Sequence, residues 1–186
     1  MKLDMHFYGD PVLREQTKPV AAITDELCAL ADDMIETMRE EKGIGLAAPQ
    51  IGRSVALCVI DLPMDYDVDE EGNRFNPDVA MPMILFNPQI VESGRKTDSH
   101  EEGCLSFPDI RGNIDRPLEI KLCYLDEKGE AHERVIVDFL ARVIQHEVDH
   151  LNGVLFIDRM SAAKRFALSK RLKRLSQETK NRLGIE

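Results

Sequence analysis

The stretch Gln145-His-Glu-Val-Asp-His-Leu151 is the part of the sequence that decides the fold and indicates the chemistry. Residues four apart lie one above the other on a helix, so the rings of His146 and His150 can reach a single metal ion. Glu147 lies between them and can accept and return a proton. An apolar stripe at helical spacing runs through the same region, formed by Leu140, Ile144, Val148 and Leu151. Such a helix is buried and its ionisable side chains need partners, so the stretch predicts a metal-dependent hydrolase rather than a pair of solvated histidines.

A third ligand must come from elsewhere, because a catalytic metal of this kind takes three protein ligands and keeps one position for water. One class of metalloproteases continues the pattern as His-x-x-Gly-x-x-His, but here the last of these positions is Phe156, which excludes that class. A downstream glutamate is a weak candidate, since Glu178 and Glu186 both lie in a basic tail. Upstream, Cys104 lies in Glu101-Glu-Gly-Cys-Leu-Ser-Phe-Pro108 and is the best candidate for the third ligand.

Three motifs occur in the order Gly43-Ile-Gly-Leu-Ala-Ala-Pro-Gln-Ile-Gly52, Glu102-Gly-Cys-Leu-Ser106 and Gln145-His-Glu-Val-Asp-His150. In all three the chain resembles the bacterial peptide deformylases, and three motifs in register make the resemblance highly specific. Weaker similarity near residues 9–14 and 152–158 extends it to about Arg159. An acidic insertion from Asp61 and the C-terminal tail depart from the family pattern, and neither changes a motif residue.

The resemblance implies an enzyme that removes the N-formyl group from the N-terminal formylmethionine of nascent polypeptides and releases formate. It implies that Cys104, His146 and His150 hold the metal and that Glu147 carries the proton. It assigns stabilisation of the oxyanion to the side-chain amide of Gln50 and the backbone N–H of Leu105. For Gln50, capping of a loop is the alternative.

The identity of the metal is open on ligand type, because cysteine and histidine suit zinc as well as iron, nickel or cobalt. The resemblance implies Fe(2+) as the native ion, with Zn(2+) or Ni(2+) as occupants of the isolated protein. Two other functional classes compete with a deformylase. A metalloendopeptidase would cut unformylated peptides internally, and a non-enzymatic metal-binding or ribosome-associated module would hydrolyse nothing. The module would have no need of Glu147 between its ligands.

Five residues are candidates for the substrate site. Gly45 allows close backbone approach, so an extended peptide can pair with the loop that contains it. The resemblance assigns Ile44, Phe139 and Val143 to the methionine pocket, and the two residues of the helix fall on the same face as the histidines. Arg111 matches a position near the peptide backbone. Ordinary core packing is the alternative for the apolar residues, and a solvated side chain is the alternative for Arg111.

Periodicity predicts an α+β fold of antiparallel strands packed around a central metal-binding helix, with a C-terminal helix, in a single domain over residues 1–186. Thr24 caps a first helix with the stripe Leu27, Leu30, Met34 and Met38, and the motif from Gly43 to Gly52 is expected to be a loop. Asp138 opens the histidine helix and Gly153 closes it. Strands are expected over residues 55–62, 84–91 and 118–124, the last with a hairpin partner at 131–137.

Composition bounds where the protein works. The formal net charge of −10 disfavours DNA as a partner. The absence of a signal peptide and of a membrane-length apolar run predicts a cytoplasmic protein with no membrane partner. Four cysteines without a C-x-x-C pair are expected to be one ligand and three buried free thiols: Cys28, Cys58 and Cys123. Asp149 is expected to be structural, paired with Arg116.

Charge is unevenly distributed along the chain. Residues 61–82 hold seven acids against Arg74 and lack periodicity, which predicts an exposed loop. Residues 161–183 predict a basic helix with the stripe Leu168, Leu172 and Leu175. The resemblance implies that such a helix docks on the ribosome near the tunnel exit, where formylated chains emerge. The alternative is a solvated basic face on an acidic body.

Overall fold

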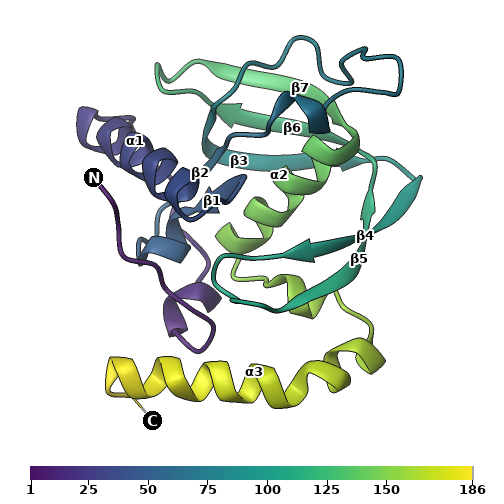
Figure 1. Ribbon diagram of the computed structural model, residues 1–186. Coiled ribbons are helices and arrows are strands. Elements are labelled where there is room, and N and C mark those ends of the chain that lie inside the picture. The colour runs from purple at the N-terminus through teal and green to yellow at the C-terminus, as the bar shows by residue number, and fades with distance from the viewer. Residues whose placement is uncertain (186) are drawn as a thin grey trace.

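The computed structural model describes residues 1–185 and places the histidine helix, α2 (Asp138–Leu151), at the centre of the fold. A five-stranded antiparallel sheet lies on one side of α2 and a two-stranded hairpin on the other, as Figure 1 shows. The last helix, α3 (Ala162–Leu183), runs along the lower edge of the molecule in that view. None of the described helices combines the length and the hydropathy needed to cross a membrane.

The sheet has the strand order β1-β2-β3-β6-β7, and every neighbouring pair is antiparallel. Its strands are β1 (Gly45–Ala47), β2 (Leu57–Ile60), β3 (Met83–Ser93), β6 (Glu119–Leu125) and β7 (Ala131–Val137). The hairpin consists of β4 (Thr97–Gly103) and β5 (Arg111–Pro117). Helix α1 (Asp25–Glu40) packs on β1 and β2. The predicted α+β class, with a central helix and a C-terminal helix, is confirmed.

Helix α2 forms where its apolar stripe predicts and is buried from Leu140 to Leu151. Asp138 begins it with a φ of 58°, and its carboxylate accepts a hydrogen bond from the Phe139 N–H at 2.8 Å. The helix ends before Gly153, whose φ of 69° lies in the left-handed region that favours glycine. Both predicted ends are therefore confirmed, and burial from Leu140 onward fixes the direction of the side chains that the helix presents.

The other predicted elements agree with the structure where an apolar period marks them. Helix α1 is capped by Thr24, whose hydroxyl accepts a hydrogen bond from the Leu27 N–H at 3.3 Å. The hairpin partner β7 covers the predicted residues, and β2, β3 and β6 differ from prediction by a few residues at their ends. Helix α3 is capped by Ser161 and buries Leu172 in a cluster with Leu13 and Phe107.

Three predictions are corrected by the structure. The first motif is not only a loop, because Gly45–Ala47 pairs with β2 as an edge strand too short to show a period. The acidic segment is not uniformly exposed, because Asp67 is only 2% exposed and bonds to Arg74 and Asn76. All four cysteines are free, but of the three expected to be buried only Cys58 is, while Cys28 and Cys123 are half-buried.

Candidate active site

Three candidate metal ligands meet between α2 and the turn that follows β4. The donor atoms of Cys104, His146 and His150 all lie within 4.8 Å of one another. Cys104 Sγ lies 3.2 Å from Nε2 of His150, and the two imidazole centroids are 5.1 Å apart. The histidines come from successive turns of α2, while the cysteine arrives at the end of the hairpin strand β4. The geometry brings together the three residues that the sequence proposed as ligands.

This cluster fits a divalent cation. Nδ1 of His146 bonds to the Glu102 carboxylate at 2.9 Å, which leaves the other ring nitrogen for a metal. Burial lowers the pKa of His150 well below its ordinary value, so this imidazole is neutral, as a ligand must be. Burial also opposes a charge on His146, but hydrogen bonds to Cys104 and Glu102 raise its pKa well above the ordinary value. Surroundings that hold a proton on His146 would also hold a cation.

Glu147 lies beside this cluster as a buried acid with an unpartnered oxygen. Its side chain is 4% exposed, and within residues 1–185 its Oε2 atom has no hydrogen-bond partner. Burial outweighs the nearby positive charges of His146 and Arg116 and raises the pKa of Glu147 to about 7. A carboxyl group with such a pKa exchanges a proton readily at neutral pH. The helix position that the sequence assigned to proton transfer therefore has the properties that this role needs.

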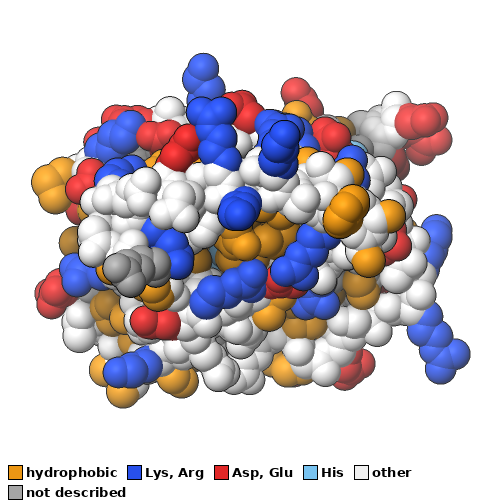
Figure 2. All heavy atoms as spheres, turned by 90° about the horizontal axis from the view of Figure 1, so that it is seen from below, with side chains coloured by type: hydrophobic (Ala, Val, Ile, Leu, Met, Phe, Trp, Pro, Cys, Tyr) orange, Lys and Arg blue, Asp and Glu red, His pale blue; other side chains and the backbone are white. Residues whose placement is uncertain are grey.

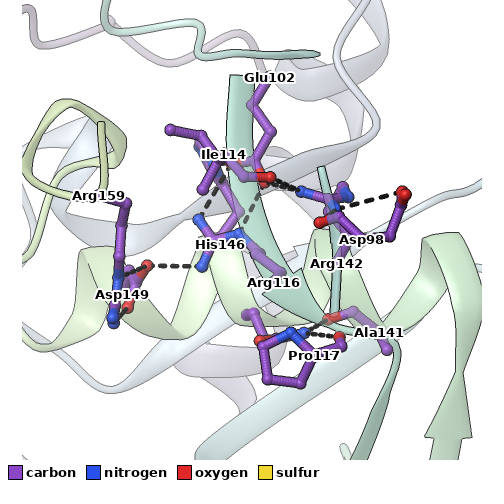
Figure 3. A network of polar contacts seen from close by, with 11 residues as sticks. Asp98, Glu102, Ile114, Arg116, Pro117, Ala141, Arg142, His146, Asp149 and Arg159 are labelled. Carbon is purple, nitrogen blue, oxygen red and sulfur yellow. Dashed lines mark hydrogen bonds and ion pairs between the residues drawn. The ribbon is translucent and has the colours of Figure 1, made fainter. Parts of the chain in front are cut away.

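Glu102 organises the polar network that supports the cluster (Figure 3). Its carboxylate accepts hydrogen bonds from the Arg116 Nε at 2.7 Å, from the Arg142 Nη1 at 2.8 Å and from His146. Burial opposes the charge on Glu102, but His146 and Arg116 outweigh it and lower the pKa of Glu102. The carboxylate thus stays ionised and fixes the orientation of the His146 ring. The sequence placed Glu102 in a motif without assigning it this part.

Asp149 faces away from the cluster. Its carboxylate accepts hydrogen bonds from Arg116 Nη1 at 2.8 Å and from Arg159 Nη2 at 2.6 Å, as Figure 3 shows. The predicted pairing with Arg116 is therefore confirmed. Because the same guanidinium also bonds to Glu102, it ties the hairpin to α2 on the far side of the ligands.

A cavity of about 810 Å³ opens beside the cluster. Ten of the residues proposed from the sequence line it: Ile44, Gly45, Gln50, Cys104, Leu105, Arg111, Phe139, Val143, His146 and Glu147. The eleventh, His150, lies behind them at 1% exposure. Two of the three ligand candidates, the proton-carrier candidate and the pocket candidates thus line one cavity.

Gln50 has contacts on both ends of its amide. Its Oε1 accepts a hydrogen bond from the Ala47 N–H at 2.9 Å, which anchors the motif that contains it. Its Nε2 donates to Ser106 Oγ at 3.2 Å and to Cys104 Sγ at 3.4 Å. One end of the Gln50 amide therefore caps the loop, as the alternative predicted, while the other end faces Cys104.

Two aromatic residues of the cavity were missed by the sequence reasoning. Tyr66, from the acidic segment, stacks on Phe139 with ring centroids 5.4 Å apart. His100, from β4, meets the same Phe139 ring edge-on, also at 5.4 Å. No motif or period marks either residue, because each reaches the cavity through a segment that is otherwise polar. The acidic segment therefore contributes part of the cavity wall.

Comparison with known proteins agrees with this site. Residues 3–166 match the profile of the polypeptide deformylase family. A peptide deformylase of Opitutus terrae is 48% identical over 97% of this chain and 96% of its own length, and one of Salinibacter ruber is 44% identical over 94% and 89%.

Solved structures agree as well. The peptide deformylase of Synechococcus elongatus in complex with actinonin gives a TM-score of 0.79 at 42% identity, covering 91% of this chain and 87% of that one. The peptide deformylase of Thermotoga maritima gives a TM-score of 0.75 at 41% identity, covering 87% and 99%. The chain, with its three motifs assembled around one cavity, belongs to the polypeptide deformylase family.

Proposed function

We propose how this chain carries out the reaction of its family, the removal of the formyl group from the N-terminal formylmethionine of nascent polypeptides. The chain is a hydrolase, and its products are formate and a free amino terminus. One observation carries the assignment of roles: the donor atoms of Cys104, His146 and His150 lie within 4.8 Å of one another, at a cavity that Cys104, His146 and the buried Glu147 line. We treat residues 1–186 as one catalytic domain.

Cys104, His146 and His150 would hold one divalent metal ion. When bound, such an ion supplies Lewis acidity, which acidifies water at the site and polarises a carbonyl oxygen. A thiolate and two neutral imidazoles carry a single negative charge, so the ligand set leaves a divalent ion with net positive charge. We propose Fe(2+) as the native ion and Zn(2+) or Ni(2+) as occupants of isolated protein. Metal analysis of anaerobically purified protein tests this assignment.

Glu147 carries the proton through the reaction. It takes a proton from the water that attacks the formyl carbon, and it gives that proton to the amine nitrogen as the C–N bond breaks. The raised pKa of about 7 suits both directions of transfer, because neither protonation state is strongly preferred at neutral pH. Transfer of one proton in and one out leaves the enzyme unchanged at the end of the cycle.

Gln50 and Leu105 would stabilise the oxyanion that develops on the formyl oxygen. The Gln50 side chain is 2% exposed, and the bond from the Ala47 N–H to its Oε1 directs its NH₂ group towards Cys104. Leu105 follows the cysteine directly and lines the same cavity. Donors fixed before the reaction stabilise developing charge without reorganisation, which is the usual advantage of such sites.

The methionine side chain would occupy the apolar wall formed by Ile44, Phe139 and Val143. Phe139 and Val143 lie one turn apart on α2, on the side that faces the cavity. Gly45, on the edge strand β1, and Arg111, at the start of β5, would lie along the peptide backbone beyond the methionine. An edge strand offers backbone groups to which an extended peptide can pair.

Hydrolysis of a short formyl-Met peptide by anaerobically purified protein tests the function. We expect formate release in step with a new amino terminus, and loss of both when a chelator removes the metal. The unformylated peptide should stay intact. Internal cleavage of the unformylated peptide would indicate a metalloendopeptidase, and metal binding without hydrolysis of either peptide would indicate a binding module.

We also propose that α3 docks the enzyme on the ribosome in the cytoplasm, at the site where formylated chains emerge. Figure 2 shows Lys and Arg side chains gathered on the face of the molecule along which α3 lies. Residues 159–186 hold nine basic side chains against Glu178 and Glu186. Attraction to phosphate would supply affinity, and the contact would weaken steeply with salt.

Truncation is a poor test of docking, because the chain after Met160 includes Leu172, which is buried in a core cluster. Charge reversal at the exposed Lys170 and Lys173 leaves that packing in place. We expect these reversals to reduce co-sedimentation with ribosomes at low salt and to leave cleavage of short peptides unchanged. The same reversals at the exposed Lys96 and Lys128 serve as the matched control. Equal co-sedimentation of both variants would mean that α3 is a solvated helix.

A further inference from the structure

The edge strand β1 passes directly over the Glu147 carboxylate at Gly45. A Cβ atom built on Gly45 would lie 2.8 Å from Cδ and 3.0 Å from Cγ of Glu147, and it would lie closer still to Oε1. Real Cβ atoms essentially never come under 3.0 Å from a neighbour. Any side chain at Gly45 therefore requires either the strand or the carboxylate to move.

The backbone conformation does not explain why this residue is a glycine. Gly45 lies outside the left-handed region, unlike Gly52 and Gly153, whose φ values are 73° and 69°. An L-residue would therefore fit the backbone of β1 without strain. What excludes a side chain is the space taken by Glu147.

Neither backbone is free to give way. Gly45 pairs with Ile60 in β2, and the carbonyl of the preceding Ile44 accepts a hydrogen bond from the Asp61 N–H at 3.0 Å. Glu147 lies in the buried part of α2. The Glu147 carboxylate is instead the movable end of a side chain, and within the described part of the chain its Oε2 has no partner to hold it. A Cβ on residue 45 would therefore displace the Glu147 carboxylate and leave the backbones of β1 and α2 in place.

We propose that Gly45 is a positioning residue for Glu147: the missing side chain leaves the space in which the carboxylate stands at the reaction centre. This assignment rests on the proposed role of Glu147 as proton carrier. It differs from a role in substrate approach, because it acts on the chemical step and not on peptide binding. At the other two glycines of the motif an added Cβ would meet other side chains first: Leu105 Cδ1 at 2.7 Å for Gly43, and His6 Nε2 at 2.5 Å for Gly52.

An activity cycle between residues 45 and 147 tests the assignment. Gly45→Ala should lower kcat about 100-fold, the cost of a displacement of roughly 1 Å in a reacting group, with little change in KM. Glu147→Asp shortens the side chain by one methylene, so this variant by itself has lower activity. In the Glu147→Asp background, Gly45→Ala should lower kcat much less than it does in the wild-type background, because the shorter side chain relieves the contact. Gly94→Ala, at a glycine that does not line the cavity, is the control for a glycine-to-alanine change and should keep wild-type kcat.

A stability cycle gives a second reading that needs no activity. Gly45→Ala should lower the thermal midpoint in the wild-type background and should lower it less in a Glu147→Ala background, where the obstructing carboxylate is gone. Equal destabilisation in both backgrounds would overturn the assignment. So would a Gly45→Ala enzyme with raised KM and unchanged kcat, or losses from Gly45→Ala and Glu147→Asp that simply multiply. An inactive wild-type protein would instead count against the proposed function, and the stability cycle would still report on the contact.

Discussion

Glu147 and Asp149 are buried acids two residues apart on α2, yet the structure treats them in opposite ways. Asp149 is 7% exposed, and both of its oxygens accept hydrogen bonds from arginines. Glu147 is 4% exposed, and within residues 1–185 its Oε2 atom accepts none. A buried acceptor without a hydrogen-bond partner lowers the free energy of unfolding. A buried acceptor with all its hydrogen bonds formed has this cost only when a partner is removed. The Glu147 side of α2 thus leaves an acid without a full set of partners, and the Asp149 side ties the helix to its neighbours.

The arginines on the Asp149 side of α2 explain how the structure tolerates the unpartnered carboxylate on the Glu147 side. Arg116 and Arg142 fix Glu102, and Glu102 fixes the His146 ring, so hydrogen bonds among protein side chains hold the ligand cluster in place. Polar groups that face the cavity can then remain available to a substrate. Substitutions on the two sides of α2 should therefore separate effects on activity from effects on stability.

The largest expected effect is on turnover, at Glu147. Glu147→Gln should lower kcat by about 10²–10⁴-fold, the typical contribution of a positioned acid–base group, while the protein retains stoichiometric metal. Because the carboxylate is buried without a full set of partners, its removal should leave the free energy of unfolding unchanged or increase it. Steady-state kinetics, metal analysis and chemical denaturation measure the three quantities. Near-normal turnover would sink the role assigned to Glu147.

The next effect is on stability, at Arg116. Arg116→Ala leaves Glu102 and Asp149 buried without their shared partner, which should lower the free energy of unfolding by about 3–5 kcal/mol. Arg174→Ala is the control, because Arg174 pairs with Glu178 on the exposed face of α3, where solvent screens the ion pair and it adds little stability. Denaturant titration compares the two variants. If they lost the same stability, the buried network would not be the support proposed here.

The sequence predicted those parts of the site that a period or a motif marks. His146, Glu147 and His150 follow from helical spacing, rejection of the downstream candidates left Cys104 as the best third ligand, and the family resemblance supplied Gln50. The hairpin of β4 and β5 was missed, because the exposed residues of Thr97–Gly103 leave no apolar alternation. The bond by which Glu102 orients the His146 ring was also missed, as was the close approach of Gly45 to Glu147. Each depends on which atoms lie across a long-range contact, and a single sequence does not show that.

A third effect concerns the rate of thiol oxidation, which should differ between a cysteine at the cavity and one in the core. Cys104 lines the cavity, while Cys58 is fully buried and its pKa is raised by burial and by the charge of Glu147. Peroxide should therefore add oxygen to Cys104 several-fold faster than to Cys58, because a thiolate at an accessible site reacts first. The iron form should lose activity faster than the zinc form. Peptide mass spectrometry ranks the sites, and equal modification of all four cysteines would contradict the ranking.

The smallest expected effect lies at the rim of the cavity, where Tyr66 stacks on Phe139. Aromatic pairs contribute about 0.5–1.5 kcal/mol beyond their buried area, so Tyr66→Ala should raise KM for formyl-Met peptides by about 2- to 12-fold. It should leave kcat near the wild-type value, since the ring contact of Tyr66 is with Phe139 and not with Glu147 or a ligand candidate. Tyr124→Ala is the matched control, because Tyr124 stacks on His132 with ring centroids 5.0 Å apart and neither residue lines the cavity. A KM equal to that of the control would mean that the acidic segment covers the cavity without taking part in recognition.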